Sequence, residues 1–256
     1  IAERVPSLAK QKMNMDLDDV IGGLVAAPLV DQIVEVVPSP SFDLEAYISN
    51  YTGRTRATRL KFIAERVPSL HRDAFRMLLQ EVKSGQNVQL YRETLELIGD
   101  KLGPPDQLRD NEWMERTQEL NEKTLEKLEV ELCQHKLNSI KEKVRMGHND
   151  LGQHHLATGN LPEALKCYTR TRDYGTTGRH TLDMCMSVIR VGLEMGNYSH
   201  VVNYIAKAEQ ITDMVLDGGS SLRLRVASGL AHLDGGKYKQ AALKLLHVRL
   251  DRPDLS

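Results

Sequence analysis

The chain has 256 residues, with 34 lysines and arginines against 35 aspartates and glutamates and a formal net charge of −1. Such a balance produces no global field that would attract nucleic acid or an anionic membrane. We therefore expect protein partners recognised through local surface features, with no membrane partner and no nucleic-acid partner. The length is sufficient to bury a core without disulfides or metals.

Cysteine usage and hydropathy both indicate an intracellular protein. The three cysteines are an odd number and lack the spacing of metal ligands. The most apolar run, Val20–Val37, contains Pro28, Asp31 and Glu35, so a membrane span there would bury charges. The sequence thus favours a reducing compartment, and we expect the protein in the nucleus and cytoplasm.

Residues 1–41 are expected to be a flexible or poorly assigned leader, in which Pro38 and Pro40 prevent a helix from continuing. The first eight residues, Ile1–Leu8, read IAERVPSL and are identical to Ile63–Leu70. Because the similarity does not extend into the flanking residues, the two copies do not indicate a structural repeat. Our hypothesis is that the first copy is an artefact of sequence assignment.

Residues 42–104 are predicted to form short helices joined in hairpins. Ser41 followed by Glu45 is typical of a helix N-terminus, Pro68 predicts a helix start, and Gly85 predicts a helix end. Apolar residues recur at helical spacing in three stretches of this region. They are Leu60, Ile63, Ala64 and Val67; Leu70, Ala74, Met77, Leu78 and Val82; and Leu90, Thr94, Leu97, Ile98 and Leu102.

Residues 105–145 are predicted to form a long charged helix or hairpin that braces its neighbours. The prolines in the segment Leu102–Gln107 separate it from the preceding helices, and Trp113 is expected to anchor packing. A narrow apolar stripe follows, made of Leu125, Leu128, Leu132, Leu137, Ile140 and Val144. This stripe is too short and irregular for sustained heptads, which disfavours a free coiled-coil dimer.

Residues 146–256 contain three copies of a short motif that starts at Gly159, Gly196 and Gly236, at spacings of 37 and 40 residues. Each glycine follows one amphipathic helix and precedes another, as a left-handed residue that reverses the chain does. We expect a large residue two positions later to wedge between the helices and a small or branched residue five positions later to allow close approach. These residues are Leu161, Tyr198 and Tyr238, and Ala164, Val201 and Ala241.

The motif resembles the tetratricopeptide repeat. In the first copy the matching residues are Leu151, Gly152, Gly159, Leu161, Ala164 and Tyr168. The second copy has Ile189 in place of Gly152, whereas the third restores Gly229 and has Pro253 at the position of the closing proline. The resemblance implies an all-α protein, a right-handed α-solenoid of degenerate tetratricopeptide-like helix hairpins leading toward a further module.

No set of residues forms a convincing catalytic, cofactor or metal site. His154 and His155 are adjacent, so on a helix they point about 100° apart and cannot converge on one ion. His148 shares a face with His155, but no carboxylate or thiol is placed to complete a set. Cys167 and Cys185 fit core positions of amphipathic helices. We therefore expect no enzyme activity, no cofactor and no metal.

The segment GRTRATRLK, Gly53–Lys61, concentrates positive charge. Its cationic residues are Arg54, Arg56, Arg59 and Lys61. A solvated helix face accounts for them, and a binding patch for an acidic protein partner is the alternative. Nucleic acid fits less well because no stacking aromatic residues are interleaved.

The segment Leu137–Tyr174, which contains GHNDLGQHHLATGNLPEALKCYTRTRDY, resembles the family of the first subunit of the COP9 signalosome. The resemblance covers about Phe42–Tyr238, and a lid subunit of the proteasome is a more distant relative. It implies a helical-repeat arm that leads into a PCI module. The winged helix of that module is missing, so we expect an N-terminal fragment.

The resemblance implies a non-catalytic scaffold subunit that joins other signalosome subunits. In this family the assembly removes a ubiquitin-like modifier from cullins, and its metalloprotease centre lies in another subunit. Cullin-based ubiquitin ligases are expected as further partners, with roles in development and photomorphogenesis. A proteasome-lid relative and a freestanding peptide-binding adaptor remain alternatives, although Asn149, Arg190 and Lys207 do not form an evident repeated set for a peptide groove.

Overall fold

The computed structural model describes residues 42–103, 109–211 and 218–251, and all regular structure in these ranges is helical. The all-α prediction is therefore confirmed. The leader, its copy of IAERVPSL and Pro253 lie outside the described residues. The α-helices are α2 (Leu44–Ile48), α3 (Gly53–Arg66), α4 (His71–Ser84), α5 (Val88–Ile98), α7 (Asn111–Leu137), α8 (Lys141–Thr158), α9 (Leu161–Arg170), α10 (Gly178–Met195), α11 (Tyr198–Glu209), α12 (Gly218–Asp234) and α13 (Tyr238–Asp251).

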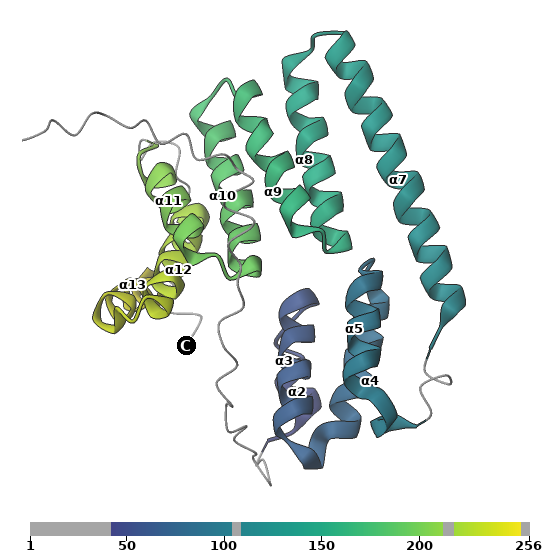
Figure 1. Cartoon of the computed structure of the whole chain (residues 1–256). Helices are drawn as coiled ribbons and strands as arrows, with labels where there is room; N and C mark the ends of the chain where they lie inside the picture. The colour runs from purple at the N-terminus through teal and green to yellow at the C-terminus, as the bar shows by residue number, and fades with distance from the viewer. Residues whose placement is uncertain (1–41, 104–108, 212–217, 252–256) are drawn as a thin grey trace, which may run out of the picture.

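From α7 onward each helix packs against the next one in sequence. The pairs α8–α9, α10–α11 and α12–α13 form three successive hairpins, with α7 on the outer side of α8 (Figure 1). Hairpins that contact mainly their neighbours are the architecture of a helical solenoid, which confirms the predicted series of hairpins. We call α8 to α13 the repeat arm. Within the described ranges, no helix combines the length and apolarity needed to cross a membrane.

Helices α2 to α5 form an N-terminal module with its own core. α3 and α4 pair as a hairpin across the 3-10 turn Pro68–Leu70. The largest of its fully buried side chains are Tyr91, Phe75, Ile48, Leu60, Leu78 and Ile98. The ring of Tyr91 is covered by Trp113 from α7, with ring centroids 4.9 Å apart. The module is thus closed partly by its own helices and partly by the start of α7.

The first helix begins at a different cap from the one predicted. Ser41 lies outside the described residues, and Asp43 caps α2, its Oδ1 accepting from the backbone N–H of Glu45 at 2.9 Å. Asp43 has extended backbone angles and immediately precedes the first helical residue, which is the position where a carboxylate satisfies a free N–H group.

Helix α7 has 27 residues and links the N-terminal module to the repeat arm. It contacts α5 near its start and packs along α8. Leu132 and Val144 are buried in the seam between α7 and α8, but Leu137 is 80% exposed and Ile140 is 40% exposed. The predicted apolar stripe is therefore wrong at Leu137 and Ile140, because α7 ends there and the two residues lie at the hairpin tip.

Candidate interaction surfaces

Left-handed glycines reverse the chain between the two helices of each hairpin in the repeat arm. Gly159, Gly196 and Gly236 have φ angles of 89°, 69° and 68°. Glycine adopts this region without a steric penalty. Asn160 and Asn197 follow the first two glycines, and their side chains cap the helices that come next. The turns therefore keep one geometry although their sequences have diverged.

Small residues bring the two helices of a hairpin close together. A Cβ atom on Gly152 would lie 2.8 Å from the Tyr168 ring, and one on Gly229 would lie 2.8 Å from Leu245. The residues five positions after the turn glycines are fully buried: Ala164, Val201 and Ala241. Any larger side chain at these positions would force the helices apart.

In the second copy, the point where α10 and α11 approach most closely lies one helical turn nearer to the loop that joins them. Ile189 and Ile205 are both buried at the positions where the first copy has its glycine and tyrosine. Gly192 provides the close approach instead, since its Cβ would lie 2.8 Å from Cγ2 of Val201. Aligning the three motif copies did not identify Gly192, because it lies three positions after the place where the other two copies have their glycine. Its position four residues before Gly196 was the available signal.

The large residues after the turn glycines do not all lie between helices. Leu161 is buried, and Tyr198 is partly buried and packs against the core of the arm. Tyr238 is 71% exposed, so the wedge expected at this residue is wrong. Equivalent positions of the three hairpins thus differ in burial.

The histidines of the first hairpin are packing residues. The rings of His154 and His155 lie 5.8 Å apart at an angle of 63°, and burial lowers the pKa of both. His148 is 2% exposed and stacks on Tyr174, and burial lowers its pKa to about 4. Within the described ranges, no group of three or more histidine, cysteine or acidic side chains is placed to hold a metal ion.

The buried cysteines occupy apolar surroundings. Cys167 and Cys185 are 5% and 0% exposed, and burial raises the pKa of both thiols. A raised pKa keeps a thiol protonated at neutral pH, and the thiol is the less nucleophilic form. These side chains therefore contribute to packing in the arm.

Two arginines of the predicted basic patch point toward other parts of the protein. Arg54 donates to Glu194 of α10 at 3.0 Å, and Arg56 lies 3.5 Å from Glu81 of α4. Both carboxylates are less exposed than the arginines they pair with. These two charges connect elements of the chain and do not belong to one open basic surface.

The other two cations of the patch lie on different sides of α3. Arg59 stacks on the ring of Tyr51 and donates a hydrogen bond to the hydroxyl of Tyr47 at 2.6 Å. Lys61 is exposed. Because positions 59 and 61 are about 200° apart around a helix, the two side chains project in different directions. The structure thus does not bring the four cations together as one patch.

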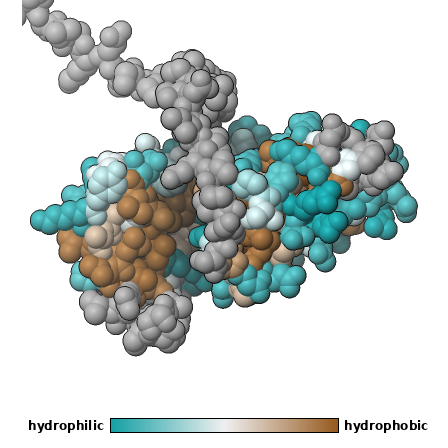
Figure 2. Space-filling model, turned by 90° about the horizontal axis from the view of Figure 1, so that it is seen from below, coloured by the Kyte–Doolittle hydropathy of each residue, from teal (hydrophilic) through white to brown (hydrophobic). Residues whose placement is uncertain are grey.

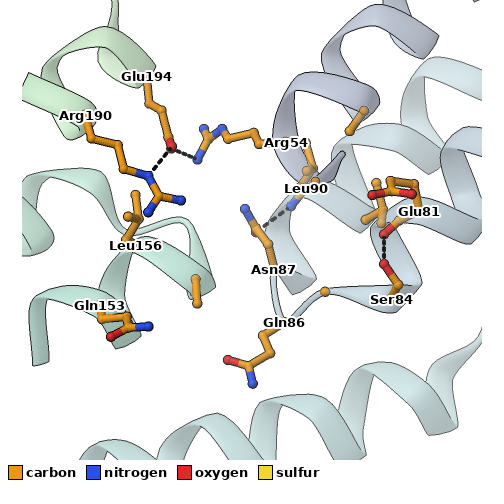
Figure 3. Close-up of a pocket in the computed structure, with 15 residues that line it drawn as sticks. Arg54, Glu81, Ser84, Gln86, Asn87, Leu90, Gln153, Leu156, Arg190 and Glu194 are labelled. Carbon is orange, nitrogen blue, oxygen red and sulfur yellow. Dashed lines mark hydrogen bonds and ion pairs between the residues drawn. The ribbon is translucent and has the colours of Figure 1, made fainter. Parts of the chain in front are cut away.

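A cavity of about 300 Å³ lies where the N-terminal module meets the repeat arm (Figure 3). One wall comes from α3, α4 and the loop Gly85–Asn87, and the other from α8 and α10. Glu194 accepts from Arg54 at 3.0 Å and lies 3.7 Å from Arg190, so it pairs with a cation on each side (Figure 3). The Arg54–Glu194 pair links the two parts of the chain across the cavity, whereas Arg190 and Glu194 both belong to α10.

The loop Gly85–Asn87 fits directly against the first turn of the repeat arm. A Cβ atom on Gly159 would lie 2.8 Å from Cγ of Asn87, so the asparagine occupies the space that a side chain would need. From the other side, Asn121 of α7 donates to the carbonyl oxygen of Gln86 at 2.9 Å. We call these contacts the joint between the module and the arm.

The last hairpin exposes apolar side chains. Figure 2 shows a broad hydrophobic area over this end of the molecule. The exposed apolar residues of α12 and α13 include Leu230, Leu233, Leu243 and Leu246, the last two being 53% and 58% exposed. Solvent-facing apolar clusters of this kind are typical of surfaces that pack against other protein.

Comparison with known proteins adds sequence relatives to this architecture. Residues 110–253, more than half of the chain, match the family described as 26S proteasome subunit RPN7. The chain is 44% identical to COP9 signalosome complex subunit 1 of Arabidopsis thaliana, over 83% of this chain and 48% of that protein. It is 34% identical to subunit 1b of Drosophila melanogaster, over 86% of this chain and 52% of that protein.

Another similar protein is COP9 signalosome complex subunit 1 of Emericella nidulans, which is 35% identical over 91% of this chain and 47% of its own length. The chain spans about half the length of the curated relatives it matches. The similarity to these relatives extends beyond the part that the family match covers. The chain, with its helical hairpins, therefore belongs to the family of the 26S proteasome subunit RPN7 and is a homologue of subunit 1 of the COP9 signalosome.

Proposed function

We propose that the chain is a non-catalytic scaffold subunit of the COP9 signalosome that contributes protein contacts to cullin deneddylation and so to the regulation of ubiquitin ligases. The observation that carries this is the similarity to signalosome subunit 1 proteins over most of the chain. Other signalosome subunits are its proposed partners, with cullin-based ligases as further ones. Action in the nucleus and cytoplasm, in development and photomorphogenesis, belongs to the same proposal.

The described surfaces support a role in positioning other proteins. His148, His154, Cys167 and Cys185 are packed in the arm, and Arg54 is paired with Glu194 at the cavity. A rigid series of hairpins provides extended surfaces on which several proteins can be held at fixed distances.

A pull-down with the tagged chain tests the assembly. We expect it to recover signalosome subunits together with cullins from an extract that contains the native complex. The matched control is the variant Gly152→Trp, which should not fold its first hairpin because the Tyr168 ring occupies the space. Recovery of no signalosome subunit by the folded chain would contradict the proposal.

Deneddylation assays test the non-catalytic role. The purified chain alone should leave a neddylated cullin intact. Added to a signalosome from which subunit 1 has been left out, it should increase subunit incorporation and deneddylation. Modifier removal by the chain alone would overturn the proposal.

A proteasome-lid subunit is the second candidate, because the family match over residues 110–253 carries that description. The same pull-down distinguishes the two, since lid subunits would then replace signalosome subunits among the recovered proteins. A freestanding peptide adaptor is less well supported. Arg190 lies near Glu194 and Lys207 lies 4.4 Å from the ring of Tyr204, so two cations suggested for a groove are engaged within the arm.

A further inference from the structure

Aromatic and arginine side chains gather along one side of α3 and beside the end of α2, where two of the tyrosines also pack against the core of the N-terminal module. We call this surface the aromatic–arginine stripe, made of Tyr47, Tyr51, Arg59, Phe62 and Arg66. The last three are spaced by three and four residues and so share one side of α3. Tyr47 comes from α2, and Tyr51 comes from the loop that joins the two helices. The buried residues of α3 lie on its opposite side.

Both arginines of the stripe are held against rings. Cζ of Arg59 lies 4.0 Å from the ring centroid of Tyr51, and its Nη1 donates to the hydroxyl oxygen of Tyr47 at 2.6 Å. Cζ of Arg66 lies 5.5 Å from the ring centroid of Phe62. These cation–π contacts restrict the arginine rotamers before any partner arrives, which reduces the entropy lost on binding.

The stripe differs from the rest of α3 in how its charges are balanced. Among the described residues, the structure records no ion pair for Arg59 or Arg66. Arg54 and Arg56 on the same helix do have carboxylate neighbours, one in α10 and one in α4. Two arginines of α3 thus pair with carboxylates of other helices, whereas Arg59 and Arg66 have aromatic rings as their neighbours.

The exposed groups of the stripe are of the kind that dominates protein interfaces. Phe62 is 59% exposed and is flanked by the two arginines. Aromatic and arginine side chains are enriched among the residues that contribute most to binding. A guanidinium that is stacked on a ring still has N–H groups at its edge, and these can bind a carboxylate through two parallel hydrogen bonds.

We propose that the aromatic–arginine stripe is a docking surface for a partner protein segment that carries carboxylates beside an apolar side chain. The carboxylates bind the edges of Arg59 and Arg66, and the apolar side chain covers Phe62. The inference goes beyond the proposed scaffold role and does not depend on which assembly the chain joins.

Two other occupants fit the stripe less well. Single-stranded nucleic acid binds by stacking bases on rings, but Arg59 already covers the ring of Tyr51. The net charge of −1 also supplies no general attraction for phosphates. A second copy of the chain would bring the same cations face to face, which is repulsive.

Peptide display identifies what the stripe binds. A library of random short peptides is selected on the immobilised full chain and counter-selected on the double variant Arg59→Gln/Phe62→Ala. We expect the selected peptides to be enriched in aspartate and glutamate next to leucine or an aromatic residue. The best of them, fluorescently labelled, becomes the probe for anisotropy measurements at about 150 mM salt, where weak long-range attraction is screened.

Single variants then test each part of the stripe. Arg59→Gln and Phe62→Ala should each weaken probe binding about tenfold, and replacing the acidic residues of the probe by their amides should have the same effect. Lys61→Gln is the matched control, because it removes one exposed charge from the same helix but lies off the stripe, and it should change binding less than about twofold. Circular dichroism should show all three variants folded, because none of the three side chains belongs to the buried core of α3.

Several outcomes would overturn the inference. One is a selection without acidic enrichment, and another is an equal loss for Lys61→Gln and Arg59→Gln. Tighter binding of a labelled oligouridine than of the probe, lost in Arg59→Gln, would indicate a nucleic-acid surface. Self-association in sedimentation experiments that Phe62→Ala abolishes would indicate a second copy.

Discussion

The N-terminal module and the repeat arm are both built from antiparallel helix pairs, but their helices are brought together differently. The two largest fully buried side chains, Tyr91 and Phe75, both belong to the module. In the arm, close approach depends on the absence of side chains at Gly152, Gly192 and Gly229. In the module, stability depends on the contacts of individual large side chains. In the arm, it depends on a short distance between neighbouring helices, which small residues allow. We therefore expect large-to-small substitutions to destabilise the module most and small-to-large substitutions to destabilise the arm most.

Removing a large ring should damage the module most. Tyr91→Ala is expected to lower the free energy of unfolding by about 3–5 kcal/mol, because it leaves a cavity beneath Trp113 and removes the hydroxyl that accepts from the Asp110 N–H at 3.1 Å. Chemical denaturation measures the total loss, and hydrogen exchange should place it in α3 to α5. Tyr91→Phe keeps the ring and should cost about 1 kcal/mol. An equal loss in both variants would mean that the ring does not hold the module together.

Adding a large ring should damage the arm. Ala164→Trp places an indole where Ala164 is fully buried, and we expect a loss of about 1–3 kcal/mol from the forced separation of α8 and α9. Thermal melting measures the change. Ala242→Trp is the control, because Ala242 is exposed on the second helix of another hairpin. Equal melting of both variants would count against close helix approach at Ala164.

Acidification should weaken the arm through His148. Its pKa is about 4 in the folded chain, against an ordinary value of 6.5, chiefly because burial disfavours the charged ring. The unfolded chain binds the extra proton first, so this contribution is fully present above pH 6.5 and is lost as the pH falls toward 4. We expect about 1–3 kcal/mol over that range in chemical denaturation.

The variant His148→Phe separates this effect from the other histidines. Phenylalanine does not titrate and keeps a ring against Tyr174, so the stability of the variant should change less between pH 6.5 and 4. Some dependence should remain, because burial also lowers the pKa of His154 and His155. An unchanged pH profile in His148→Phe would exclude His148 as its source.

Two turn glycines provide the smallest and sharpest comparison. Gly159→Ala and Gly196→Ala should each cost about 1–2 kcal/mol, because both backbones are left-handed. Gly159→Ala should cost more, since its Cβ would also meet Asn87, whereas the space at Gly196 is open within 4 Å. Denaturation of the two variants measures the difference. Equal costs would show that Asn87 yields without loss and that the joint is loose.

The sequence predicted the parts of the fold that depend on the regular spacing of residues along the chain. The recurrence of Gly159, Gly196 and Gly236 indicates three hairpins because a left-handed turn needs glycine and each turn needs two flanking helices. The apolar periodicity likewise indicates the helices of the module. Such regular features leave a signal that one sequence is enough to detect.

The sequence did not predict the features that depend on single contacts between distant residues. Arg54 and Glu194 are 140 positions apart, and no local pattern distinguishes this arginine from Arg59. Gly192 was missed because its copy of the hairpin moved the close approach by one turn. The exposure of Tyr238 was missed because equivalent motif positions have different neighbours: Tyr198 packs against the core of the arm, whereas Tyr238 is 71% exposed.

Helix α7 covers the outer side of the first hairpin and exposes a charged surface there. A further hairpin therefore cannot stack on α8 from that side, and the series of hairpins is closed at α7. Head-to-tail filaments need two complementary ends on every copy. Because α7 occupies one of the two faces that such a contact would use, the described hairpins cannot join copies of the chain into a filament through α8.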